Sequence, residues 1–171
     1  MQHLELILGG ARSGKSLLAE TRAESSKQQL CYIATATAGD AEFARRIEHH
    51  RQRRDARWQV VEEPVKLAQT LADNAATEKC LLVDCLTLWL SNCLHAGVWP
   101  EEKLQLLEVL PELPGHTILV SNETGLGVVP LGELSRTFVD EAGFLHQALG
   151  QLCQQVTLTV AGLPLSLKGE A

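Results

Sequence analysis

The sequence lacks the features that mark membrane proteins and disulfide or zinc scaffolds. Its most apolar run, residues 80–90, contains Asp84 and is too short to cross a bilayer. The five cysteines are odd in number and form no C-x-x-C pair, so we expect reduced thiols in a cytoplasmic protein. The first expected strand begins at residue 4, which leaves no room for a signal peptide ahead of it.

The sequence also lacks an excess of basic residues. Fifteen Lys and Arg stand against 21 Asp and Glu, a net charge of −6, which argues against broad binding to nucleic acid or membrane surfaces. The Asn-Lys-x-Asp signature of regulatory GTP-binding switches is absent. With 171 residues, 45% of them hydrophobic and 21% charged, the chain is most simply one catalytic domain over residues 1–171.

What the sequence does contain is a phosphate-binding loop. An apolar run over residues 4–8 predicts a buried strand, the pattern Gly9-x-x-x-x-Gly14-Lys15-Ser16 follows, and a helix is expected over about 15–26. Glycines allow successive backbone N–H groups to point at one anion, and the helix adds the positive end of its dipole. A glycine-rich turn after an edge strand is the alternative, which the flanking strand and helix disfavour. The predicted phosphate contacts are Gly9, Gly10, Ala11, Arg12, Ser13, Gly14, Lys15 and Ser16.

The rest of the chain alternates between apolar strands and helices. Continuous apolar strands separated by helices predict an α/β fold with a mostly parallel sheet covered on both faces. Further strands are expected over residues 30–34, 58–62, 80–84, 117–121 and 156–160. Helices are expected over residues 40–54, 64–76, 101–109 and 131–153, and another follows the strand at 80–84 and runs through Trp89 to His95.

Asp84 ends a buried apolar strand. In phosphate-loop enzymes such an acid lies beside the loop and holds Mg²⁺, directly or through water, together with the hydroxyl of Ser16. The alternative is that Asp84 only caps the helix that follows it.

A basic segment over residues 45–54 stands out in an acidic chain. Glu48 is its only acidic residue, so the arginines are poorly paired locally and are suited to binding phosphates. On a helix, His50 shares the inward face with Phe43 and Ile47, whereas His49 lies about 100° away. His50 is therefore either a buried structural histidine or a nucleophile that attacks phosphorus.

Two further segments have polar residues where a strand ends. Glu62 and Glu63 are either exposed charges or hydrogen-bond acceptors for a ribose or base. Residues 121–130 combine two glycines with polar groups, and they form either a plain surface loop or the wall of a substrate site.

Taken together, these segments resemble the bifunctional adenosylcobinamide kinase/adenosylcobinamide-phosphate guanylyltransferase family of cobalamin biosynthesis. The resemblance runs from residue 4 to about residue 162. It rests on the phosphate loop, residues 32–35, the histidine pair within residues 46–51, Trp58 with Glu62, residues 84–87, and the Asn-Glu-x-Gly-x-Gly-x-x-Pro loop at 122–130.

The resemblance implies a RecA-like phosphate-loop fold, a homotrimer and two reactions. The first phosphorylates adenosylcobinamide with ATP or GTP, and the second transfers GMP from GTP to that phosphate through a guanylyl-histidine. His50 is then the guanylylated residue, Lys15 a second catalytic residue, and Ser16 and Asp84 the Mg²⁺ ligands. Nucleotide contacts beyond the loop are implied at Ala34, Thr35, Ala36, Arg51, Gln52, Arg53, Arg54, Glu62 and Asp84. A small-molecule kinase without guanylyl transfer, with His50 structural, remains the alternative.

Overall fold

A single twisted β-sheet lies at the centre of the structure, a computed structural model that describes residues 2–36 and 57–169. In the described residues its strand order is β3-β2-β4-β5-β1-β6-β7. Six strands pair in parallel and β7 pairs antiparallel with β6. The strands are β1 (His3–Gly9), β2 (Gln29–Ala34), β3 (Trp58–Glu62), β4 (Lys79–Asp84), β5 (His116–Asn122), β6 (Gln155–Val160) and β7 (Leu163–Lys168).

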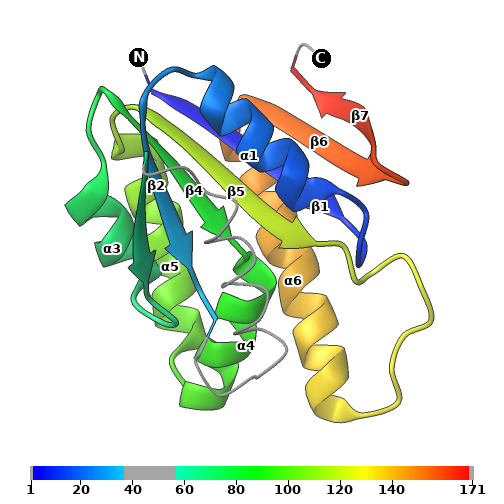
Figure 1. Ribbon diagram of the computed structural model, residues 1–171. Coiled ribbons are helices and arrows are strands. Elements are labelled where there is room, and N and C mark those ends of the chain that lie inside the picture. Colours follow the sequence, from blue (N-terminus) through cyan, green and yellow to red (C-terminus); the bar gives the residue numbers. More distant parts are fainter. Residues whose placement is uncertain (1, 37–56, 170–171) are drawn as a thin grey trace.

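Helices cover both faces of the sheet (Figure 1). One face packs against α1 (Lys15–Ser25), and the other against α3, α4, α5 and α6. No helix in the described ranges is long and apolar enough to span a membrane. The helices of the second face are α3 (Leu67–Asn74), α4 (Leu86–Ala96), α5 (Trp99–Val109) and α6 (Glu133–Leu152), and a short 3₁₀ turn, η1 (Leu110–Glu112), follows α5.

The central strands are apolar because both of their faces are buried. In β1, Leu4, Leu6 and Leu8 pack under α4 and α6, while Ile7 faces Ala19 of α1. Parallel strands that are covered on both faces have nearly continuous apolar sequences. The expected α/β fold with a mostly parallel sheet and helices on both faces is confirmed.

One expected helix start is wrong. The segment after β3 was expected to be helical from Pro64, but α3 begins at Leu67. The Oε1 atom of Glu63 accepts the backbone N–H groups of Val65 and Lys66, both at 2.8 Å. Those hydrogen bonds hold the chain in a turn, and the helix forms only beyond it.

A seventh strand was not expected. Ala161 and Gly162 have φ values of 52° and 79°, so the chain makes a two-residue turn after β6 and returns as β7. Positive φ at both central positions is typical of tight hairpin turns. The alternation of Leu163, Leu165 and Leu167 is the sequence signal that identifies this strand.

Candidate nucleotide-binding site

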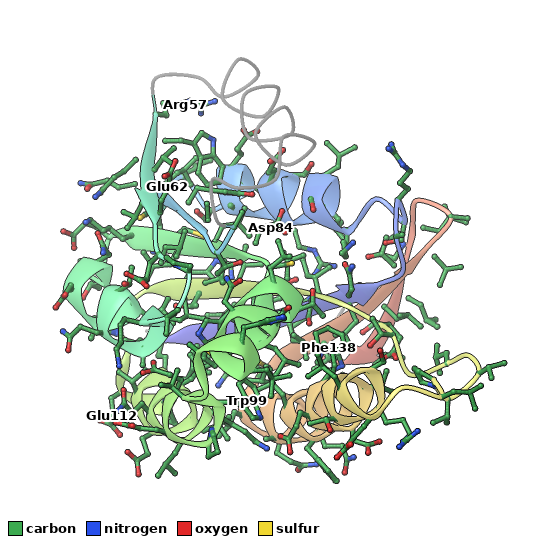
Figure 2. All side chains as sticks on the ribbon, turned by 90° about the horizontal axis from the view of Figure 1, so that it is seen from below. Arg57, Glu62, Asp84, Trp99, Glu112 and Phe138 are labelled. Atoms are coloured by element: carbon green, nitrogen blue, oxygen red, sulfur yellow. The ribbon has the colours of Figure 1, made fainter. Side chains whose placement is uncertain are left out.

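The residues predicted to bind a nucleotide come from separate segments that meet at one edge of the sheet. Ala34 pairs with Glu62 on one side and with Asp84 on the other, and Gly9 pairs with Asn122. All of these residues end parallel strands, and open α/β sheets bind ligands at that edge. Figure 2 shows Glu62 and Asp84 on this side of the molecule.

The loop between β1 and α1 needs glycine at both motif positions. Gly14 has φ 93°, a conformation that other residues rarely adopt. A Cβ atom on Gly9 would lie 2.3 Å from the Oγ of Ser13 and 2.8 Å from the carbonyl oxygen of Thr159. The N–H of Leu18 donates to the carbonyl of Gly14, so α1 begins directly after the loop. The first turn of α1 has no acidic residue, which leaves its positive dipole end available to an anion.

Lys15 lies over this loop. Its Nζ donates a hydrogen bond to the carbonyl oxygen of Gly10 at 3.2 Å, and the residue is only 9% exposed. Burial raises the pKa of the Cys85 thiol, Asp84 raises it further, and the ammonium of Lys15 lowers it, so Lys15 acts electrostatically on the end of β4. Lys15 therefore places a cation at the phosphate loop.

The turn between β6 and β7 packs against the phosphate loop. The N–H of Gly162 donates to the carbonyl of Ser13 at 2.8 Å. The Cα of Gly162 also lies 3.2 Å from the position that a Cβ on Gly14 would take. This contact was missed at the sequence level because the hairpin that makes it was missed.

Asp84 is separated from the phosphate-loop strand by one intervening strand. The order β4-β5-β1 places two strand spacings, about 10 Å, between the ends of β4 and β1. The strand β5 lies between the two strands, and all three end at the same edge of the sheet, so the predicted role of Asp84 as the acid beside the loop stays a prediction. The hydroxyl of Tyr32 donates to Oδ2 of Asp84 at 3.2 Å and orients the carboxylate.

The oxygen donors near the loop fit a hard cation. Ser16 is half-buried in the first turn of α1, and Asp84 is half-buried at the end of β4. Hydroxyl and carboxylate oxygens are ligands that Mg²⁺ accepts.

The segment directly after β2 is held in place by hydrogen bonds of Thr35. Thr35 is fully buried, its Oγ1 donates to the carbonyl of Cys85 at 2.7 Å, and the same atom accepts the N–H of Cys85 at 2.9 Å. The amide of Asn92 donates to the carbonyl of Thr35 at 2.8 Å. Among the predicted contacts at residues 34–36, the Thr35 side chain therefore supports the fold, and Ala36 is the more accessible residue.

Glu62 and Glu63 have different surroundings. The carboxylate of Glu63 accepts two backbone N–H groups at the start of α3. Glu62 is exposed at the end of β3, opposite Ala34 in the sheet register. Of the two acids that the sequence left open, Glu62 has the position of a ligand contact.

The loop over residues 121–130 starts beside the phosphate loop. The N–H of Glu123 donates to the carbonyl of Gly9 at 3.0 Å, and Ser121 shares a 2.8 Å hydrogen bond with Nε2 of His146. Leu126 and Val128 are 83% and 97% exposed. Next to this loop is a hollow of about 410 Å³, lined by Ser91, Leu94, His95, Thr124, Pro130, Leu134, Ser135, Phe138 and Val139.

The basic segment lies outside the described residues. This applies to the predicted nucleophile His50, to His49, and to the predicted contacts Arg51, Gln52, Arg53 and Arg54. The described chain stops at Ala36, two residues beyond the end of β2, and resumes at Arg57 before β3.

Comparison with known proteins gives close relatives over nearly the whole chain. The chain is 62% identical over 169 residues to the bifunctional adenosylcobalamin biosynthesis protein CobP of Pseudomonas aeruginosa, covering 97% of this chain and 98% of the relative. It is 35% identical over 179 residues to the bifunctional adenosylcobalamin biosynthesis protein CobU of Escherichia coli, covering 95% and 98%.

Solved structures support the fold at low sequence identity. A prototypical ATPase from the type III secretion system of pathogenic bacteria aligns with TM-score 0.56 and 12% identity, over 96% of this chain and 56% of that chain. The RadB recombinase aligns with TM-score 0.53 and 16% identity, over 91% and 73%. The fold is that of a RecA-like phosphate-loop NTPase. Residues 5–167 match the family described as cobinamide kinase / cobinamide phosphate guanyltransferase, and the chain belongs to that family.

Proposed function

We propose that this chain carries out both reactions for which its family is named. It phosphorylates adenosylcobinamide with ATP or GTP, and it then transfers GMP from GTP to adenosylcobinamide phosphate, which gives adenosylcobinamide-GDP. The observation that carries the proposal is the position of Lys15, which donates to the backbone of the phosphate loop, with Asp84 at the same edge of the sheet.

In the kinase step, the loop and α1 bind the triphosphate. Backbone N–H groups of residues 10–16 and the ammonium of Lys15 neutralise the phosphate oxygens while the substrate hydroxyl attacks the γ-phosphorus. The new bond joins the corrinoid oxygen to phosphorus, and the bond to the β-phosphate oxygen breaks. Ser16 and Asp84 would hold Mg²⁺, which neutralises charge on the leaving phosphates.

In the transfer step, His50 attacks the α-phosphorus of GTP and releases pyrophosphate. The guanylyl group then passes from the imidazole to the corrinoid phosphate, and His50 is restored. Support comes from Ala36, where the chain enters the histidine-bearing segment at the binding edge, and from Glu62, which lies at the same edge at the end of β3. Arg51, Gln52, Arg53 and Arg54 would contact the nucleotide and stabilise charge on its phosphates.

The loop at residues 121–130 would form the corrinoid wall. Its apolar side chains are exposed, and it borders the 410 Å³ hollow between α4 and α6. Exposed apolar groups beside a catalytic edge suit a large, partly apolar substrate.

We also propose a homotrimer in the cytoplasm. Leu163, Leu165 and Leu167 on the edge strand β7 are more than half exposed, which suits burial against another subunit. All five cysteines are free and buried, as expected in a reducing compartment. Light scattering should give three times the chain mass of 18.7 kDa.

The two activities are tested with adenosylcobinamide and GTP labelled at either phosphorus. We expect the γ label and then the α label in the corrinoid product. His50→Ala should abolish transfer of the α label and keep much of the γ transfer, with His49→Ala as the milder matched control. If the unmodified enzyme transfers only the γ label, the chain is a kinase without guanylyltransferase activity.

A further inference from the structure

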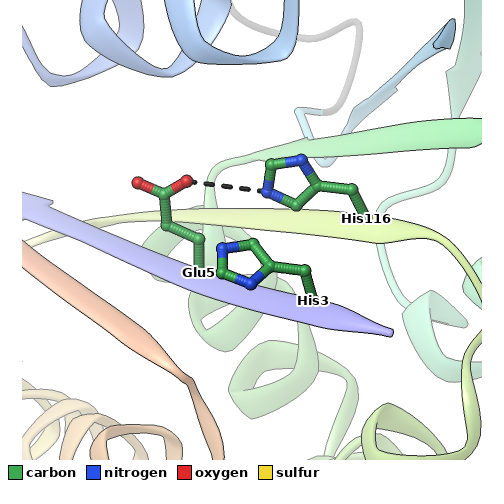
Figure 3. Close-up of side chains that lie close together, drawn as sticks. All are labelled: His3, Glu5 and His116. Carbon is green, nitrogen blue, oxygen red and sulfur yellow. Dashed lines mark ion pairs between the residues drawn. The ribbon is translucent and has the colours of Figure 1, made fainter. Parts of the chain in front are cut away.

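Three side chains with metal-binding atoms converge at the end of the sheet opposite the phosphate loop. His3 and Glu5 lie two residues apart on β1 and so point to the same face, and His116 on β5 is the register partner of His3. One nitrogen from each imidazole and one oxygen of the carboxylate all lie within 4.8 Å of one another. Figure 3 shows the three side chains side by side on neighbouring strands.

This cluster is mostly enclosed. Glu5 is only 1% exposed, and its Oε2 lies 3.6 Å from Nε2 of His116. That nitrogen is buried and has no hydrogen-bond partner among the residues described. His3 is less buried and its ring lies edge-on to His116, with centroids 4.8 Å apart. The cluster therefore contains one unsatisfied nitrogen next to a carboxylate, with an approach from the side of His3.

The other oxygen of Glu5 is already held in place. Arg22 of α1 contacts Oε1 of Glu5 and donates a 3.0 Å hydrogen bond to Oγ1 of Thr157. A carboxylate that ligates a metal through one oxygen is commonly held in place by a second group that contacts the carboxylate.

We propose that His3, Glu5 and His116 bind one divalent transition-metal ion, such as Zn²⁺, Co²⁺ or Ni²⁺. Two imidazole nitrogens and one carboxylate oxygen suit these ions, whereas Mg²⁺ prefers oxygen donors alone. Bonds of about 2.1 Å place tetrahedral ligand atoms about 3.4 Å apart. Oε2 of Glu5 and Nε2 of His116 are already near that separation. A rotation of the His3 side chain would bring its ring nitrogen equally close to both atoms.

Arg22 limits the affinity of this site. Its guanidinium offsets the charge of Glu5, so the ion's charge is less compensated than it would be beside an unpaired carboxylate. The site therefore binds more weakly than a dedicated structural zinc site. It also makes an unusual prediction: removing Arg22 should strengthen metal binding.

The site is separate from the nucleotide site. Glu5 and Gly9 are four residues apart on one strand, about 13 Å. A metal ion here joins β1 to β5 under α1, and it stabilises the folded chain by mass action without contacting the reacting phosphates.

The test uses the untagged full chain, stripped with a chelator and kept in excess Mg²⁺. Zn²⁺ and Co²⁺ are titrated by calorimetry, and the visible spectrum of bound Co²⁺ reports nitrogen ligation. We expect one ion per chain, at least tenfold weaker binding in His116→Ala and in the more exposed variant His3→Gln, and tighter binding in Arg22→Gln. His95→Ala, an exposed histidine on α4, is the matched control and should bind as the unmodified chain does.

Three results would overturn the proposal. The first is that the unmodified chain binds no ion. The second is that His3→Gln and His116→Ala bind the ion as tightly as the unmodified chain does. The third is that His95→Ala loses binding while those two variants keep it. If His116→Ala fails to fold, His3→Gln decides the question alone.

Discussion

The two ends of β1 differ in what their polar groups contact. At the Gly9 end, backbone N–H groups and the ammonium of Lys15 lie at an open edge of the sheet. At the other end, Glu5, Arg22 and the two histidines contact one another beneath α1. The first end lies at the edge where a ligand would bind, and the second uses most of its polar groups for internal pairing.

This difference separates function from stability along one strand. A change of Lys15 at the open end should alter catalysis more than stability, because its ammonium acts on the phosphates of the nucleotide. A change at the enclosed end should destabilise the fold and spare the catalytic groups, because a buried charge loses its partner.

The largest effect is expected at the open end. Lys15→Ala removes the cation that neutralises the phosphates, and kcat/KM of both reactions should fall by roughly 10²- to 10³-fold. The urea unfolding midpoint should stay close to that of the unmodified chain. Lys27→Ala, an exposed lysine after α1, is the control. Full activity in Lys15→Ala would contradict the assignment.

The next effect is expected at the enclosed end. Glu5→Gln leaves the mostly buried guanidinium of Arg22 without its anion, and the free energy of unfolding should drop by about 3 kcal/mol. Urea unfolding measures this, and turnover at saturating nucleotide should persist wherever the variant is folded. Glu24→Gln on the exposed surface of α1 should change neither quantity. An unchanged midpoint for Glu5→Gln would show that the pair does not stabilise the fold.

Two adjacent glycines make a matched pair within the loop. A Cβ at Gly9 would clash with Ser13 and Thr159, whereas one at Gly10 meets nothing within 4 Å. Gly9→Ala should weaken binding of a fluorescent GTP analogue about tenfold, or about 1.4 kcal/mol. Gly10→Ala should stay within about twofold, and equal losses in both would mean that the loop geometry is not the cause.

The smallest effect distinguishes two adjacent acids. Glu63→Ala removes the acceptor for two N–H groups before α3 and should cost about 1 kcal/mol of stability, with little change in nucleotide affinity. Glu62→Ala should do the reverse. Unfolding midpoints and binding titrations on both variants test this, and identical behaviour would remove Glu62 from the site.

The sequence predicted those parts of the structure that depend on residues close together in the chain. The phosphate loop, the strand before it and α1 form one continuous pattern, so their structure and position follow from residues 4–26. Asp84 and Glu62 were found because each ends an apolar strand, and parallel strands end at one edge.

The features that the sequence did not predict depend on the order of the strands in the sheet. The insertion of β5 puts one strand between the strand of Asp84 and the phosphate-loop strand, and it also places His116 opposite His3. Both follow from strand order, which the sequence pattern does not specify. The start of α3 at Leu67 depends on two backbone N–H groups that donate to the side chain of one residue, Glu63.

In the proposed function, His50 carries GMP between the two reactions. The most direct test is the intact mass of the chain after incubation with GTP and Mg²⁺. The account predicts a gain of one guanylyl group per chain, stable to base and labile to acid, present in His49→Ala and absent in His50→Ala and Lys15→Ala. No mass gain in the unmodified chain, or a gain that survives in His50→Ala, would contradict it.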